Sequence, residues 1–268
     1  MSRFSRAGSL GLKHLADNSY KAIDEGVYDR AKYDLTHNAM DIRKAIYSCP
    51  HAPLITEVKF ASPSAGQIYK DAARPQDIGK SMVSSGAVAL SVLTQPHLFN
   101  GSPDNLAAIR RAVDVPLLMK DIVVSEVQID SAKQCGADCV LLIMAVFDQD
   151  LAEGSLDRFI DYSRRKGLQV LLEVHKNAEF LDVSRYKVEL VGINNRNLDT
   201  MKIDIAITEN LLKEYGKGKN TIVSESGIKT PDDIRYLRQA GADAFLIGTG
   251  IMESADIAAK VQELYHSI

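Results

Sequence analysis

The feature that most constrains this chain is a repeated unit that begins at residue 54: a short apolar run, a polar turn and an amphipathic helical stretch. The predicted strands are Leu54–Phe60, Ala87–Leu93, Leu117–Lys120, Cys139–Ile143, Gln169–Val174, Val188–Asn194, Thr221–Ser224 and Ala244–Ile247. The predicted helices lie near Gln76–Ser85, Pro103–Ala112, Glu126–Cys135, Asp150–Lys166, Ala178–Arg185, Ile205–Tyr215, Pro231–Ala240 and Ser254–Tyr265. Apolar strands that alternate with helices indicate a parallel sheet buried on both faces.

Eight strand-helix units are the number that closes an α/β barrel, so we expect a (β/α)8 TIM barrel. The alternative is a doubly wound open sheet, but Ser62-Pro63-Ser64 does not fit the glycine-rich turn of a dinucleotide-binding fold. Residues 1–50 carry no strand pattern and show helical patches near Leu10–Ala22 and His37–Tyr47. We therefore expect a single domain over residues 1–268, with an N-terminal helical extension (1–50) before the barrel (54–268).

Composition narrows the class of protein. The chain is 46% hydrophobic and 25% charged with a net charge of -3, which gives no case for nucleic-acid or membrane partners. No apolar run approaches the roughly 20 residues of a membrane span, and the N-terminus lacks the core of a signal peptide. Three cysteines and six scattered histidines predict reduced thiols, a cytoplasmic protein and no metal site.

Ionisable groups follow the apolar body of most predicted strands. In a (β/α)8 barrel the active site lies at the C-terminal ends of the strands, and the groups at those ends are Glu57, Lys59, Lys120, Asp121, Glu173, His175, Asn194, Arg196 and Glu225. Glu57 and Lys59 are two residues apart and share one face of a strand. Alone, that pair fits a surface ion pair as well as a site, but the other strand ends favour a site.

These groups suggest roles. Lys59, Lys120 and Arg196 supply positive charge for an anionic substrate, and a lysine among cations and apolar walls would have a lowered pKa and donate a proton near neutral pH. The glutamates could accept protons or pair with the lysines. No Ser-His-Asp or Cys-His set is visible, so covalent acyl chemistry is not indicated, while a Schiff-base lysine stays open.

Two small loops predict a phosphate site. Ser226-Gly227-Ile228 and Gly248-Thr249-Gly250 follow the seventh and eighth strands, which is the usual phosphate position in this fold. Ser62, in the first loop, could add a hydroxyl. The alternative is that these glycines only make tight turns.

Several motifs, in chain order, resemble those of the indole-3-glycerol-phosphate synthase family. They are Glu57-Val58-Lys59, Ala61-Ser62-Pro63-Ser64, Phe99-Asn100-Gly101-Ser102, Leu118-Met119-Lys120-Asp121, Gly192-Ile193-Asn194-Asn195-Arg196-Asn197-Leu198, Ser224-Glu225-Ser226-Gly227-Ile228 and Ala244-Phe245-Leu246-Ile247-Gly248. The resemblance runs from about residue 38 to residue 265. It implies ring closure of 1-(2-carboxyphenylamino)-1-deoxyribulose 5-phosphate to indole-3-glycerol phosphate, with loss of carbon dioxide and water and without cofactor or metal.

The resemblance also implies roles for single residues. Lys120 would be the acid and Lys59 would contact the substrate carboxylate and share the acid role. Glu173 would be the base or a stabilising carboxylate, and Glu57 and Asn194 would assist. The substrate-binding set would be Arg196, Glu225, Ser226, Phe99 and Leu198, with the last two along the anthranilate ring. The phosphate-binding set would be Ser62, Gly227, Gly248 and Thr249.

The chain departs from the family pattern at two positions. Phe60 follows Lys59 where a second basic residue is common, and Ile122 stands where a phenylalanine is usual. Competing interpretations are another enzyme on a phosphate-binding barrel, such as an aminosugar-phosphate isomerase or a thiamine-thiazole synthase, and a non-catalytic barrel. The expected partner is a small sugar-phosphate substrate, and the expected assembly is a monomer or a weak homodimer.

Overall fold

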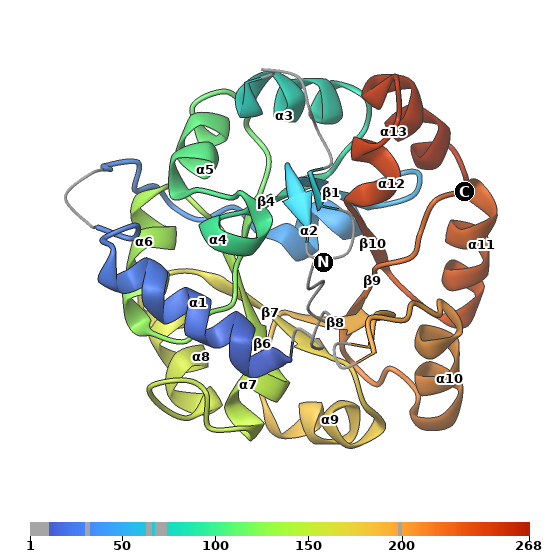
Figure 1. Cartoon of the computed structure of the whole chain (residues 1–268). Coiled ribbons are helices and arrows are strands. Elements are labelled where there is room, and N and C mark those ends of the chain that lie inside the picture. The colour runs from blue at the N-terminus through green and yellow to red at the C-terminus, as the bar shows by residue number, and fades with distance from the viewer. Residues whose placement is uncertain (1–10, 30–32, 63–65, 68–73, 198–199) are drawn as a thin grey trace, which may run out of the picture.

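The strands close into a parallel barrel. A computed structural model describes residues 11–29, 33–62, 66–67, 74–197 and 200–268. Going around the barrel, the strands are β1 (Leu54–Val58), β4 (Ala89–Leu93), β5 (Leu117–Lys120), β6 (Cys139–Ile143), β7 (Gln169–Val174), β8 (Leu190–Asn194), β9 (Thr221–Glu225) and β10 (Ala244–Ile247). β10 pairs in parallel with β1 and closes the circle (Figure 1). The predicted (β/α)8 barrel is therefore confirmed, and the open sheet is wrong.

Helices surround the barrel (Figure 1). They are α3 (Pro75–Ser84), α5 (Pro103–Arg110), α6 (Glu126–Gln134), α8 (Leu156–Arg165), α9 (Asn177–Asp182) with a 3-10 turn (Val183–Arg185), α10 (Ala206–Tyr215), α11 (Pro231–Ala240) and α13 (Ile257–Tyr265). The helix predicted from Asp150 begins only at Leu156, because the Ser155 side chain caps it by accepting from the Arg158 N–H. None of these helices, nor any other in the described ranges, is long and apolar enough to cross a membrane.

The loops at the strand ends hold short elements that the sequence pattern did not predict. These elements are the helices α4 (Pro96–Phe99), α7 (Met144–Asp148) and α12 (Thr249–Met252), and the antiparallel pair β2 (Ala61–Ser62) and β3 (Gly66–Gln67). The first predicted strand, Leu54–Phe60, was too long. β1 pairs with β4 only as far as Val58, and the chain then turns into the β2–β3 hairpin, so Lys59 lies just past the ladder.

Apolar side chains fill both faces of the sheet. Inside the barrel, Ile55, Leu118, Leu141 and Leu171 belong to one buried cluster, and outside it Leu90 and other residues pack against the helices. Every residue of β1, β4, β6, β8, β9 and β10 is buried. This two-sided burial is the reason that the strands read as continuous apolar runs.

The N-terminal extension covers both ends of the barrel. Helix α1 (Leu12–Asp24) contacts α4 and α7 at the C-terminal strand ends (Figure 1). Helix α2 (Ile42–Tyr47) lies at the other end, because its Ile42 N–H donates to Gln169 at the start of β7 and its Tyr47 hydroxyl contacts Thr221 at the start of β9. Ile42 and Ile46 are buried in the cluster that fills the barrel interior, so α2 plugs this end.

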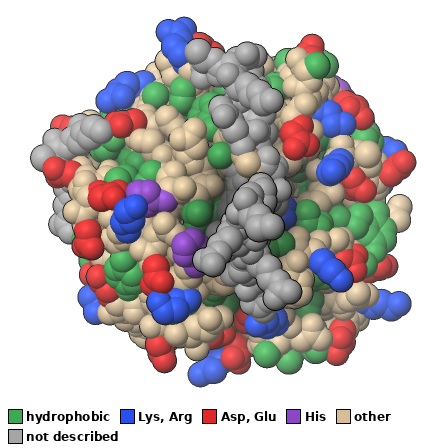
Figure 2. All heavy atoms as spheres, viewed as in Figure 1, with side chains coloured by type: hydrophobic (Ala, Val, Ile, Leu, Met, Phe, Trp, Pro, Cys, Tyr) green, Lys and Arg blue, Asp and Glu red, His purple; other side chains and the backbone are tan. Residues whose placement is uncertain are grey.

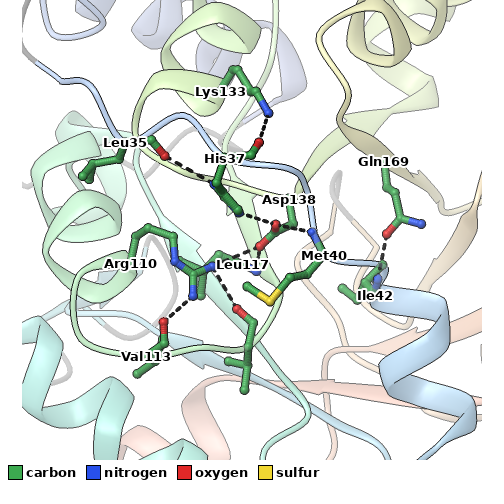
Figure 3. A network of polar contacts seen from close by, with 11 residues as sticks. Leu35, His37, Met40, Ile42, Arg110, Val113, Leu117, Lys133, Asp138 and Gln169 are labelled. Carbon is green, nitrogen blue, oxygen red and sulfur yellow. Dashed lines mark hydrogen bonds and ion pairs between the residues drawn. The ribbon is translucent and has the colours of Figure 1, made fainter.

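A buried carboxylate fastens the segment between α1 and α2 to the barrel (Figure 3). Asp138, just before β6, is fully buried. Its Oδ1 accepts from the Met40 N–H at 2.7 Å and lies 2.8 Å from His37 Nε2, while its Oδ2 accepts from the Leu117 N–H at 2.8 Å and from Arg110 at 3.2 Å. One side chain thus joins the N-terminal segment to two strands.

Because α2 closes one end of the barrel, shortening one of its buried side chains should lower the stability of the fold substantially. Ile46→Ala removes buried apolar volume below the barrel and is expected to lower the free energy of unfolding by roughly 2–5 kcal/mol, measured by urea denaturation. The matched control is Lys44→Ala on the exposed side of the same helix, which we expect to stay within about 0.5 kcal/mol of the parent. An equal decrease in the free energy of unfolding in both variants would contradict the stabilising role of the buried face of α2.

Candidate active site

A pocket of about 360 Å³ lies at the C-terminal ends of the barrel strands. Its charged and polar lining residues are Glu57, Lys59, Gln95, Lys120, Asp121, Glu173, Asn194, Arg196, Glu225, Ser226, Lys229, Thr249 and Glu253. Apolar side chains line the pocket as well, among them Leu15 of α1, Phe99 of α4 and Ile122. On the face of the molecule viewed in Figure 1, acidic and basic side chains are interspersed around the rim, without a broad field of one sign (Figure 2).

Alternate strands each contribute one charged side chain to the floor of the pocket. Glu57 is the last residue but one of β1, Lys120 ends β5, Glu173 is the last residue but one of β7, and Glu225 ends β9. In a barrel of eight strands, the inward side chains of alternate strands share one layer. We call these four residues the strand-end layer.

Lys120 is the centre of the strand-end layer. Its Nζ donates to Glu173 Oε2 at 2.9 Å and lies 3.2 Å from Glu225 Oε2. Burial disfavours the ammonium, but the negative charges of Glu173, Glu225 and Glu57 outweigh burial and raise the pKa of Lys120 above its ordinary value. The expectation of a lysine with a lowered pKa therefore fails at Lys120, because its neighbours are carboxylates and not cations.

The two carboxylates beside Lys120 behave differently. Burial raises the pKa of Glu225 to about 8. The negative charge of Glu173 also raises this pKa, whereas the positive charge of Lys120 lowers it. Burial also works against the charged form of Glu173, yet Lys120, His175 and Asn194 together hold the pKa of Glu173 well below its usual range. Near neutral pH the pocket thus holds one ionised carboxylate, Glu173, and one protonated carboxyl, Glu225, next to the same ammonium.

Glu57 and Lys59 are neighbours in the structure. Lys59 Nζ lies 3.0 Å from Glu57 Oε1, and the Ser91 hydroxyl donates to Glu57 Oε2 at 3.2 Å. Glu57 is 4% exposed, so the pair is not the surface ion pair considered for this strand. Both residues line the pocket, and Lys59 is the more exposed of the two, so its ammonium is available to a bound anion.

Two glycines leave room for these carboxylates. A Cβ at Gly248 would lie 2.6 Å from Glu57 Oε1, and a Cβ at Gly192 would collide with Glu225 Oε1. Gly248 was predicted to bind phosphate, whereas Gly192 was not predicted to have a role. The signal was present in the sequence, since glycine inside a strand often marks a close approach of another group.

Asn194 and Arg196 extend the network from the end of β8. Asn194 donates from Nδ2 to Glu173 Oε1 at 3.0 Å and accepts the Arg196 N–H at 3.0 Å. The Arg196 guanidinium lines the pocket and donates to the Met201 carbonyl at 3.5 Å. Burial lowers the pKa of Arg196, and the negative charge of Glu57 opposes this shift.

The two small loops meet at one end of the pocket. Ser226, Gly227, Gly248 and Thr249 all line it, and a Cβ at Gly250 would lie 2.8 Å from the Ile228 carbonyl oxygen, so the loops pack closely. Gly227 has φ +87°, a conformation that favours glycine. Lys229 is a lining cation that the sequence pattern did not single out. The remaining predicted residues, Leu198 and the side chain of Ser62, lie outside the described part of the chain.

Asp121 is a further lining residue, and it links the pocket to the N-terminal extension. It is buried, and it accepts from the hydroxyls of Tyr28 and Thr94, the Ile122 N–H and Gln128. Burial raises the pKa of Asp121 to about 6 in spite of these donors. Tyr28 follows α1, so this hydrogen bond ties the extension to the residue next to Lys120.

Comparisons with known proteins give one family. A family model described as indole-3-glycerol phosphate synthase matches residues 21–264. Curated proteins of that description are 42% identical over 212 residues in Methanocaldococcus jannaschii (79% of this chain, 77% of that protein) and 40% identical over 218 residues in Laribacter hongkongensis (81% of each). A solved thiamine phosphate pyrophosphorylase from Pyrococcus furiosus matches with a TM-score of 0.56 and 14% identity, over 80% of this chain and 93% of that chain. This last likeness concerns the fold alone.

The raised pKa of Glu225 predicts a pH-dependent stability. Between the ordinary value of 4.5 and about 8, the folded chain holds a proton that the unfolded chain has released, so this group makes stability fall as pH rises through that window. Glu225→Gln removes this titration, so its stability relative to that of the parent should rise across the window, by about 1 kcal/mol for each pH unit. Urea denaturation at several pH values measures the difference. The matched control is Glu253→Gln, an exposed carboxylate at the rim, and the same trend in both variants would contradict the assignment.

Proposed function

Because this chain belongs to the indole-3-glycerol phosphate synthase family, we propose that the strand-end layer and its neighbours divide the steps of the family's reaction. The enzyme is a carboxy-lyase of tryptophan biosynthesis. It closes the ring of 1-(2-carboxyphenylamino)-1-deoxyribulose 5-phosphate, releases carbon dioxide and water, and leaves indole-3-glycerol phosphate. The observation that carries the division of roles is the position of Lys120, an ammonium that faces the pocket between two carboxylates.

Ring closure needs a carbonyl made electrophilic by a proton. Lys120 is the proposed acid: its ammonium gives a proton to the substrate carbonyl oxygen while the ring carbon attacks the carbonyl carbon. Glu225, which lies 3.2 Å from Lys120 Nζ and keeps its proton near neutral pH, can return a proton to the amine. Lys120 is then an ammonium again and can donate a proton in a later step.

Decarboxylation needs an electron sink and a carboxylate out of water. Ring closure leaves an iminium, which takes the electron pair of the breaking carbon–carbon bond as carbon dioxide departs. Lys59 and Arg196 are the proposed contacts of the carboxylate before it leaves, and Phe99 and Ile122 supply the apolar wall along the ring. An isoleucine leaves more open space than the phenylalanine usual in the family, and it changes the wall without removing an acid or a base.

Dehydration needs an acid and a base on the same intermediate. Lys120 protonates the departing hydroxyl, which leaves as water, and Glu173 accepts the proton from the ring carbon. Asn194 and Glu57 assist by holding Glu173 and Lys59 in place. The substrate phosphate is proposed to bind at Ser226, Gly227, Gly248 and Thr249, with Ser62 as a further contact.

The same chemistry bears on the partners, the compartment and the assembly of the enzyme. The substrate is a small sugar phosphate, and the mixed acidic and basic side chains on the face viewed in Figure 2 give no support for a nucleic-acid or membrane partner. We expect a cytoplasmic enzyme that acts as a monomer or a weak homodimer.

The role of Lys120 predicts a large loss of turnover. Purified enzyme should form the fluorescent indole product in excess chelator, and Lys120→Ala should lower kcat by about 100-fold to 10,000-fold because the proton donor is gone. The matched control, Lys80→Ala on the exposed face of α3, should keep the parent rate. Unchanged turnover in Lys120→Ala would transfer the acid role to Lys59, and absence of product from folded parent enzyme would overturn the activity.

The paired loops predict inhibition by inorganic phosphate. Phosphate should compete with the substrate, raising KM and leaving kcat unchanged, because it occupies only the end of the pocket formed by the two loops. Steady-state kinetics at fixed ionic strength, with chloride as the control anion, measures the effect. No competition over a wide concentration range would argue against these loops as the phosphate site.

A further inference from the structure

A buried histidine stands directly behind the proposed base. His175 follows the last residue of β7 and is two positions after Glu173. Its Nε2 lies 3.0 Å from Glu173 Oε1, its side chain is 5% exposed, and it is not among the residues that line the pocket. On its far side, Glu179 of α9 accepts the His175 backbone N–H at 2.7 Å and places Oε2 3.8 Å from Nδ1.

The four side chains form a row in which the sign of the charge alternates: Lys120, Glu173, His175 and Glu179. Burial disfavours the imidazolium, but Glu173 on β7 and Glu179 on α9 outweigh burial and raise the pKa of His175 to about 9. His175 is therefore positively charged at neutral pH. Glu173 is faced in addition by Lys120, Asn194 and Glu225, from β5, β8 and β9.

The two oxygens of Glu173 are occupied unequally. Oε1 accepts a hydrogen bond from Asn194 Nδ2 at 3.0 Å and forms an ion pair with His175 Nε2 at 3.0 Å, whereas Lys120 at 2.9 Å is the one hydrogen-bond donor to Oε2 among the described residues. A carboxylate with one oxygen held by two partners cannot turn about its terminal bond without breaking both contacts. The second oxygen is thereby directed toward the pocket.

We propose that His175 is a positioning residue that anchors Glu173 Oε1 and so presents Oε2 to the substrate. The inference rests on the proposed role of Glu173 as the base. It also gives the histidine a task during turnover: when Lys120 has given its proton to the substrate, Glu173 loses its nearest cation, and the imidazolium still favours the ionised carboxylate.

The experiment compares His175→Gln and His175→Ala with the parent enzyme by kcat and KM from pH 5 to pH 10. His175→Ala should lower kcat by about 100-fold with little change in KM, because a misplaced base slows the chemistry while the pocket lining is intact. His175→Gln restores a hydrogen-bond donor without the charge, so it should recover part of kcat. In both variants the acid limb of the pH profile should move up by about one unit, since Glu173 loses a cation. The matched control, His14→Gln on the exposed side of α1, should behave as the parent.

The proposal would be overturned if both variants fold and show the same kcat, the same KM and the same acid limb of the pH profile as the parent enzyme. A change in KM alone would overturn it as well. If the His175 variants do not fold, a second measurement tests the proposal. NMR of 15N-histidine in the parent should show His175 titrating near pH 9 and moving to lower pH in Glu173→Gln, and an unchanged titration would overturn the proposal. Failure of the parent to form product would instead overturn the proposed function, so the two failures are distinguishable.

Discussion

The contact on which the site depends is the ion pairing of Lys120 with Glu173 and Glu225 inside the barrel. A buried charge is expensive unless it is paired and hydrogen-bonded, and here one ammonium serves two carboxyls that are 2% and 1% exposed. Because one cation cannot neutralise two anions, Glu225 keeps its proton while Glu173 stays ionised. The same geometry thus supplies an ammonium, a neutral acid and a carboxylate within a few ångströms of each other.

Barrel closure makes this arrangement possible. In the sequence, Glu173 follows Lys120 by 53 positions and Glu225 follows Glu173 by 52 positions. The three residues nevertheless lie at one level of the barrel, because they come from alternate strands. Gly192 and Gly248 leave space beside the carboxylates that any other side chain would fill.

The N-terminal extension takes part in the site as well as in the fold. Its helix α1 supplies Leu15 to the pocket wall, and Tyr28 donates to Asp121 at 2.7 Å, next to Lys120. Its helix α2 plugs the opposite end of the barrel, and Asp138 fastens the connecting segment. The described parts of the extension therefore contact both ends of the barrel.

The sequence by itself determined the eight-stranded barrel, because buried parallel strands read as apolar runs that end in polar groups. It also indicated which residues meet, since the strand ends of such a barrel converge. The residues of the predicted catalytic, substrate-binding and phosphate-binding sets whose side chains are described line the pocket, whereas His175, named with the strand-end groups, lies behind Glu173. Only the tertiary structure decided their protonation. A pKa depends on the charges within a few ångströms, and no spacing in the sequence reveals that carboxylates surround Lys120 or that His175 stands between two glutamates. The place of the extension was likewise decided by side-chain contacts between distant segments, such as Tyr28 with Asp121, and not by local pattern.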